Sequence, residues 1–277
     1  MADLDPVRIP TAAPSVVTSA STPRTPRRRW AGVDVTVWLP PGCFDSGRRY
    51  PVLYFHDGHN LWDAETAFGG VDWGLDEALS DLAAAGTPVI AVGTACHPTE
   101  RAREYTPHRS TWPGFAELVG DDGTGSGADH LRFWTDELKP QIDRLFPTSS
   151  AAGDTAACGS SAGGVMALYA WTQRPDLFGL AGFSPALHLC GDGVADDVRT
   201  ALAAGAAGRL HVSVGGQESE DEASRRAYVD RAKELVALLD ERPGVALRYC
   251  YDSEAPHHES AWRALLPEAL RFLLRRD

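Results

Sequence analysis

The chain has 277 residues, of which 43% are hydrophobic and 23% are charged, a composition typical of a globular protein with a large buried core. Its formal net charge of −12 would repel phosphate backbones, which argues against nucleic acid as a partner. No apolar stretch approaches the roughly 18 residues that a membrane-spanning helix needs, so no membrane partner is expected.

The N-terminal segment differs in composition from the rest of the chain. Residues 1–26 are rich in Ala, Pro, Ser and Thr and contain no continuous apolar run, unlike a secretory signal. We therefore expect a flexible tail over residues 1–30 and a single folded domain over 31–277. The five cysteines are dispersed and odd in number, which favours reduced thiols. Both observations predict a cytoplasmic protein.

Strand and helix patterns alternate along the domain. Residues 33–40 alternate apolar and polar, whereas 51–58 and 87–94 are nearly all apolar, as in strands buried on both faces of a parallel sheet. Further strands are expected at 155–160, 180–185, 210–216 and 246–252. Helices are expected at 75–85, 128–146 and 222–241 and from Trp262 to Leu273. This order predicts an α/β fold with a mostly parallel sheet, helices on both faces and a site at the carboxyl ends of the strands.

One predicted helix contains an internal break. Pro140 lies within 128–146 and has no backbone N–H to donate. We expect it to kink this helix or to begin a new one.

The segment Gly159–Gly163 reads Gly-Ser-Ser-Ala-Gly and fits the G-x-S-x-G pattern. In that pattern a strand turns sharply into a helix and lifts one serine hydroxyl above the sheet, and the small neighbours avoid steric collision. Residues with β propensity precede the segment and residues with helix propensity follow it. The spacing selects Ser161 over Ser160 as a nucleophile. The alternative is a helix cap in which either serine binds backbone N–H groups.

A reactive serine needs a base, and in this class of fold the order along the chain is Ser, acid, His. Two histidines downstream fit poorly, because His211 begins a predicted strand and His188 comes early. His257 and His258 both follow the last predicted strand, and the residues themselves do not separate the two.

The acid should follow the strand at 210–216. The acidic run there contains Glu218, Glu220, Asp221 and Glu222, most of which we interpret as solvated charge at the start of a helix. Glu218 is nearest the end of the strand and is our candidate. Donors to an oxyanion are expected at the N–H of Ala162 and at that of Asp57 or Gly58.

Several segments together resemble the putative-esterase family of α/β-hydrolases, which includes enterochelin (siderophore), feruloyl and acetyl-xylan esterases and mycolyltransferases. The matching segments, spread over about residues 33 to 274, are YPVLYFHDGHNLWD (50–63), REYTPHR (103–109), ADHLRFWTDELKPQID (128–143), CGSSAGGVMALY (158–169), GFSPAL (182–187), VGGQES (214–219) and HHESAWRALLPEALRFLL (257–274).

The resemblance implies an α/β-hydrolase fold and an assignment for each catalytic position. Relatives carry the base five residues before a tryptophan, which points to His257 ahead of Trp262. Their acid lies three residues after a strand-ending glycine, which points to Glu218 after Gly215, and Ser161 matches their nucleophile. Siderophore esterases of this type often carry an extra N-terminal domain, for which the residues before the first strand are too few. We therefore expect a compact single-domain esterase.

The function that follows is hydrolysis of a small or aromatic acyl ester through Ser161, His257 and Glu218. Acyl transfer by the same triad and a non-catalytic binding protein of the same fold are the alternatives. A small-molecule ester is the expected partner, and the sequence does not indicate the oligomeric state. No cofactor is expected, and no metal, because His56-x-x-His59 and His257-His258 lack the spacing of a metal site. Candidate substrate contacts are Trp62, Tyr105, Arg109 and Trp112.

Overall fold

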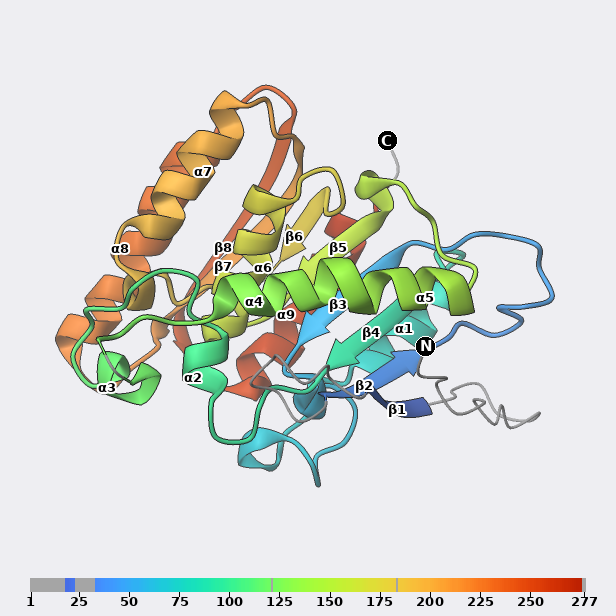
Figure 1. The fold of residues 1–277 in the computed structure, drawn as a ribbon, viewed down its shortest axis with the longest axis horizontal. Helices are drawn as coiled ribbons and strands as arrows, with labels where there is room; N and C mark the ends of the chain where they lie inside the picture. Colours follow the sequence, from blue (N-terminus) through green and yellow to red (C-terminus); the bar gives the residue numbers. More distant parts are fainter. Residues whose placement is uncertain (1–17, 23–32, 121, 183, 276–277) are drawn as a thin grey trace.

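The structure, a computed structural model, describes residues 18–22, 33–120, 122–182 and 184–275. Within these residues one sheet has eight strands in the order β1-β2-β4-β3-β5-β6-β7-β8 (Figure 1). The strands are β1 (Thr18–Thr22), β2 (Val33–Trp38), β3 (Val52–His56), β4 (Ile90–Thr94), β5 (Thr155–Cys158), β6 (Leu180–Gly182), β7 (Gly208–Gln217) and β8 (Val245–Pro256).

The sheet is parallel from β4 to β8, and β1 and β2 add antiparallel strands at one edge. Its register aligns the ends of the central strands, because Phe55 pairs with Cys158 and Cys158 pairs with Gly182. The loops that leave these strands therefore start side by side, which confirms the predicted α/β architecture and places one row of loops at one edge of the sheet.

Helices cover both faces of the sheet. The alternation of β3 shows the two cores, because Val52 and Tyr54 pack on one face and Leu53 and Phe55 on the other. One face carries α1 (Leu75–Ala84) and α9 (Glu259–Leu273), and the other carries α4 (Gly127–Phe133), α5 (Lys139–Leu145), α6 (Ser161–Gln173), α7 (Gly193–Ala203) and α8 (Glu222–Leu239). Short helices α2 (Arg101–Glu104) and α3 (Phe115–Val119) and the turns η1 (Gly58–Asn60), η2 (Phe68–Gly70), η4 (Ala152–Asp154) and η5 (Leu187–Cys190) lie in the loops.

Pro140 lies near the start of a new helical segment, as predicted, but the chain stays helical through it, because α4, the π-helical segment η3 (Trp134–Leu138) and α5 follow one another without a gap. Helix α5 begins at Lys139, so Pro140, which has no N–H to donate, is its second residue. The segment η3 joins α4 to α5. Its wider turn absorbs the change between the two helices.

The N-terminal prediction is only partly within the described residues. Residues 1–17 and 23–32 lie outside them. Thr18–Thr22 falls in the predicted tail but forms β1, which pairs antiparallel with β2 through its backbone. Its small and β-branched residues suit a strand at the sheet edge. No helix within the described residues is long and apolar enough to cross a membrane.

Two buried histidines make stability depend on pH. Burial lowers the pKa of His188 and of His211 to about 4, since a charged imidazole is poorly solvated in the interior. A histidine with a depressed folded-state pKa binds its proton more readily in the unfolded chain, so stability falls as the pH drops below the unfolded pKa of about 6.5. Each of the two histidines should therefore lower the free energy of unfolding by about 2 kcal/mol when the pH is lowered from 7 to 5.

Urea unfolding of the wild type and of His211→Gln at both pH values measures this. Between pH 7 and pH 5, the free energy of unfolding of the variant should fall by less than that of the wild type, and the difference should equal the contribution of one histidine. This holds whatever the stability of the variant at pH 7. An unchanged pH dependence would contradict the assignment.

Candidate active site

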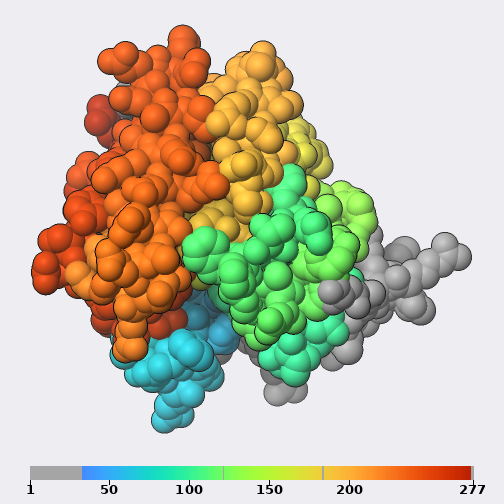
Figure 2. All heavy atoms as spheres, turned by 90° about the vertical axis from the view of Figure 1, so that its left-hand side faces the viewer, coloured from blue at the N-terminus to red at the C-terminus, as the bar shows by residue number. Residues whose placement is uncertain are grey.

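The residues singled out by the sequence meet at the carboxyl ends of the parallel strands. Asp57 follows β3, Ser161 follows β5, Glu218 follows β7 and His257 follows β8. Figure 2 looks onto this side of the molecule, where segments near residues 70, 115 and 220 to 257 surround a hollow.

Ser161 is the first residue of α6 and has a left-handed backbone with φ 54°, a conformation in which a non-glycine residue is strained. Two glycines allow this turn. A Cβ on Gly159 would lie 2.5 Å from the carbonyl carbon of Gly163, and a Cβ on Gly163 would lie 3.0 Å from His56 Cβ. The backbone therefore passes too close to itself for a side chain at position 159, and a side chain at position 163 would fit only if His56 and Asp57 shifted.

The turn is tied to the neighbouring strand. The Ser161 N–H donates to the Ser184 carbonyl at 2.6 Å, and the Ala186 N–H donates to the Ser161 carbonyl at 3.1 Å. The Ala162 N–H lies in the first turn of α6, where helix geometry provides no intrahelical acceptor. Its position suits an oxyanion donor.

Glu218 and His257 are brought together. His257 Nδ1 lies 2.6 Å from Glu218 Oε2. The other oxygen, Oε1, accepts from the Gly215 N–H at 2.8 Å and from the Ser184 hydroxyl at 3.3 Å. Glu218 is 5% exposed, so its carboxylate is fixed by bonds to three partners and orients the imidazole. The sequence analysis had not assigned Ser184 a role, although the GFSPAL segment contains it.

The structure also separates the two adjacent histidines. His258 is the N-cap of α9, and its Nδ1 accepts from the Ser260 N–H at 3.1 Å. One ring therefore caps a helix, and the other pairs with the buried acid.

Asp57 is placed differently from the expectation for an oxyanion donor. Its N–H donates to the Tyr105 hydroxyl at 3.2 Å, so Gly58 is the better candidate of the two. Its carboxylate accepts from Arg101 Nε at 2.8 Å and from Nη2 at 2.7 Å. Burial alone would raise the pKa of the Asp57 carboxyl, but the Arg101 guanidinium holds that pKa below its usual value.

Arg101 was missed by the sequence analysis, because its role depends on a loop that folds back over β3. About a third of its side chain is exposed (36%). Asp57 Oδ2 lies 3.1 Å from the position of a Cβ on Gly163, two residues after Ser161, so the ion pair sits beside the serine turn.

The four residues expected to contact the substrate lie in different environments. Tyr105 is fully buried and supports Asp57, so its ring has no open face, and Trp62 packs against the core. Arg109 is turned toward the neighbouring loop, where its Nε donates to the Asp122 carbonyl at 2.7 Å. Trp112 is half-buried and contacts His188 edge-on, with ring centroids 4.6 Å apart.

Asp57, His59 and Cys96 form a cluster whose possible ligand atoms lie within 4.8 Å of one another. Both Asp57 oxygens already bind Arg101. Burial raises the pKa of the Cys96 thiol to about 12, which disfavours the thiolate that a metal requires. The donor set therefore fits a guanidinium better than a metal ion.

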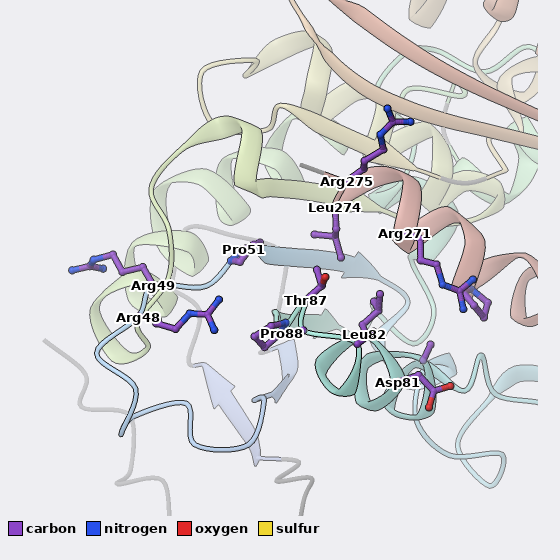
Figure 3. Close-up of a pocket in the computed structure, with 14 residues that line it drawn as sticks. Arg48, Arg49, Pro51, Asp81, Leu82, Thr87, Pro88, Arg271, Leu274 and Arg275 are labelled. Carbon is purple, nitrogen blue, oxygen red and sulfur yellow. The ribbon is translucent and has the colours of Figure 1, made fainter. Parts of the chain in front are cut away.

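A cavity of about 530 Å³ lies at the opposite end of the sheet, beside Pro51, Pro88 and Leu274. Arginines stand at its rim, but Figure 3 shows Arg49 and Arg275 pointing away from it. It is thus separate from the serine turn.

Comparison with known proteins gives concordant results. The model of the esterase family, described as Putative esterase, matches residues 31–273. The uncharacterized protein YbbA of Bacillus subtilis is 23% identical over 243 residues, which cover 86% of this chain and 91% of YbbA.

Two solved structures are similar in fold. An IroE-like serine hydrolase from Shewanella oneidensis superposes with a TM-score of 0.71 at 20% identity, covering 92% of this chain and 79% of that one. The enterobactin esterase FES from Shigella flexneri gives a TM-score of 0.69 at 20% identity, covering 98% of this chain and 60% of that one. These likenesses confirm the α/β-hydrolase fold.

The close approach at Gly159 predicts that Gly159→Ala is destabilising. The added Cβ would collide with backbone atoms that cannot move without opening the turn, so the free energy of unfolding should fall by about 2–3 kcal/mol. Chemical denaturation measures this loss. Gly153→Ala is the matched control, because no heavy atom lies within 4 Å of a Cβ there. Equal stability of the two variants would show that the turn is not sterically constrained.

Proposed function

This chain belongs to the esterase family described as Putative esterase, and from that membership we propose that it is a serine carboxylic-ester hydrolase. In this proposal Ser161 is the nucleophile, His257 the base and Glu218 the acid. The observation that carries it is the 2.6 Å contact between His257 Nδ1 and the buried Glu218 carboxylate, next to a serine held in a strained turn.

The proposed reaction follows from the contact that the His257 ring already makes with Glu218. Glu218 occupies His257 Nδ1, which leaves Nε2 to take the proton of Ser161 as its Oγ attacks the ester carbonyl. His257 then gives this proton to the departing alcohol. Water attacks the acyl-enzyme with His257 again as the base, and Ser161 Oγ leaves.

The negative charge on the carbonyl oxygen needs donors in this mechanism. The N–H groups of Ala162 and Gly58 are the backbone candidates. Arg101 is a further candidate, since Asp57 binds only its Nε and Nη2 and the guanidinium lies beside the serine turn. A fixed cation close to a developing oxyanion stabilises the transition state more than the ground state.

For the substrate, we propose an ester with a small or aromatic acyl group. Support comes from the aromatic rings beside the site, where Trp112 contacts His188 and His188 contacts Tyr228 with centroids 4.2 Å apart. The Arg101 cation would also attract an acyl group that bears a phenolate or carboxylate. The name of the FES enterobactin esterase is consistent with such a substrate.

We place the enzyme in the cytoplasm. All five cysteines lie in the described part of the chain and are free thiols, of which Cys43, Cys158 and Cys190 are buried. Unpaired thiols are typical of proteins from reducing compartments.

Replacement of the nucleophile tests the function. Ser161→Ala should lower turnover of p-nitrophenyl acetate by at least about 10³-fold, because the acyl-enzyme cannot form. The same assay with feruloyl, catecholate, acetyl-sugar and long aliphatic esters ranks the acyl groups, and the aliphatic esters should be poorest. Near-normal activity of Ser161→Ala would exclude the mechanism, and a preference for aliphatic esters would exclude the substrate class.

Removal of the cation beside the serine tests the role of Arg101. Arg101→Gln should lower kcat by about 10²–10³-fold, which is the usual cost of losing one oxyanion donor. Arg174→Gln is the matched control, since Arg174 makes the same two-bond fork to Asp176 on the exposed surface. If both variants keep the wild-type kcat in steady-state assays, Arg101 has no catalytic role.

A further inference from the structure

A fully buried carboxyl group lies at the end of the short helix that carries Arg101. Glu104, the last residue of α2, is 0% exposed, and the proposed reaction does not use it. Its Oε2 accepts from the His97 N–H at 2.7 Å, and its Oε1 lies 2.8 Å from Nδ1 of the buried His130. The two oxygens thus join the loop that follows β4, the end of α2 and helix α4, which lies beside α2 (Figure 1).

His130 extends this set of contacts to β3. Its Nε2 lies 3.3 Å from Nδ1 of His56, the last residue of β3, and the His56 ring stacks on Trp134 with centroids 4.0 Å apart. His56 and Trp134 are both buried, so neither ring can shift without moving its neighbours. Glu104 is therefore connected to the strand that ends just before Asp57.

Residues before and after Glu104 both contact Asp57. Arg101 makes two hydrogen bonds to the Asp57 carboxylate, and the Tyr105 hydroxyl accepts from the Asp57 N–H. Asp57 has a left-handed backbone with φ 55°, a conformation that is strained for a non-glycine residue. The position of α2 therefore sets both the Arg101 guanidinium and the turn that presents the Gly58 N–H.

A helix as short as α2 has little support of its own. It spans four residues, and a single turn of helix makes too few backbone hydrogen bonds to be stable alone. Contacts outside the helix must hold it, and Glu104 supplies two of them inside the core. Because water does not replace a hydrogen bond that is lost in the interior, these contacts strongly favour one position of α2.

We propose that Glu104 is a positioning residue that anchors α2 to the core, so that Arg101 keeps its place beside Ser161. The inference rests on the proposed esterase function and on Arg101 as an oxyanion donor in it. Glu104 takes no part in bond making or in proton transfer. Its effect reaches the reaction only through the position of the guanidinium.

Glu104→Leu tests the proposal, because leucine keeps a similar volume and removes both acceptors. We expect kcat for p-nitrophenyl acetate to fall by about 10–100-fold, since a displacement of about 1 Å in a group that acts on the substrate can cost that much. KM should change by less than about threefold, because Arg101 acts on charge that forms in the transition state. Rates are expressed per molecule titrated to completion with a fluorophosphonate, so that a misfolded fraction does not count.

The same substitution in an Arg101→Gln background separates positioning from stability. Without the guanidinium, Glu104→Leu should lower kcat by less than about threefold further, because the group that Glu104 positions is gone. A purely structural residue would lower kcat by the same factor with and without Arg101. If Glu104→Leu does not fold, His130→Leu replaces it, because this variant removes the α4 contact and leaves the His97 contact. The same dependence on Arg101 is then expected.

Asp143→Leu is the matched control. The Asp143 carboxylate also has two partners, Lys139 Nζ at 2.9 Å and the Thr148 hydroxyl at 2.7 Å. Thr148 pairs with Tyr50, which precedes β3, so this cluster lies at the end of the sheet opposite to Ser161. Asp143→Leu should therefore lower the free energy of unfolding and leave kcat unchanged.

The outcomes are distinct. A Glu104→Leu enzyme as fast as Asp143→Leu overturns the proposal, and so does a loss seen only in KM or a loss of equal size in the Arg101→Gln background. If Arg101→Gln itself keeps the wild-type kcat, the positioning role fails while the esterase function stands. A wild-type protein that neither hydrolyses esters nor reacts with the fluorophosphonate contradicts the proposed function itself.

Discussion

The site depends on a strained turn in which the backbone of one serine adopts a left-handed conformation between a strand and a helix. The turn requires glycine at position 159, where a Cβ would meet the backbone of α6, and leaves little room at position 163 beside β3. It is held by two backbone hydrogen bonds to the segment after β6, in which the Ser161 N–H donates to the Ser184 carbonyl and the Ala186 N–H donates to the Ser161 carbonyl. A buried sheet with helices on both faces stabilises this conformation, which the local sequence alone would not keep.

Around that turn, two buried carboxylates hold polar groups from several loops in place. Glu218 is bound by Gly215, Ser184 and His257, and Asp57 is bound by Arg101. Each carboxylate is removed from water, and each is compensated by several donors, so neither can move without leaving a buried charge unpaired. The His257 imidazole and the Arg101 guanidinium consequently have defined positions. Such preorganisation is what acyl-transfer chemistry requires.

The predictions that succeeded depend on residue patterns with direct steric or hydrophobic causes. The buried strands could be predicted because both faces of a parallel strand are apolar, and Pro140, which lacks an N–H, marked the place where a π-helical segment passes into α5. The candidates that fared less well were chosen by their place in a loop. Tyr105 is fully buried and Arg109 turns toward Asp122, since a loop's path depends on the packing beneath it.

The sequence alone determined the parallel sheet, the position of the sharp turn and the order in which serine, acid and histidine follow one another. These features depend on residues that are adjacent along the chain or on the periodic spacing of apolar residues. Only the tertiary structure distinguished His257 from its neighbour His258 by contact, assigned Asp57 to a cation, and brought Arg101 and Ser184 to the site. Those contacts join residues that are far apart in the chain, and they exist because the strand register aligns the loops at one edge of the sheet.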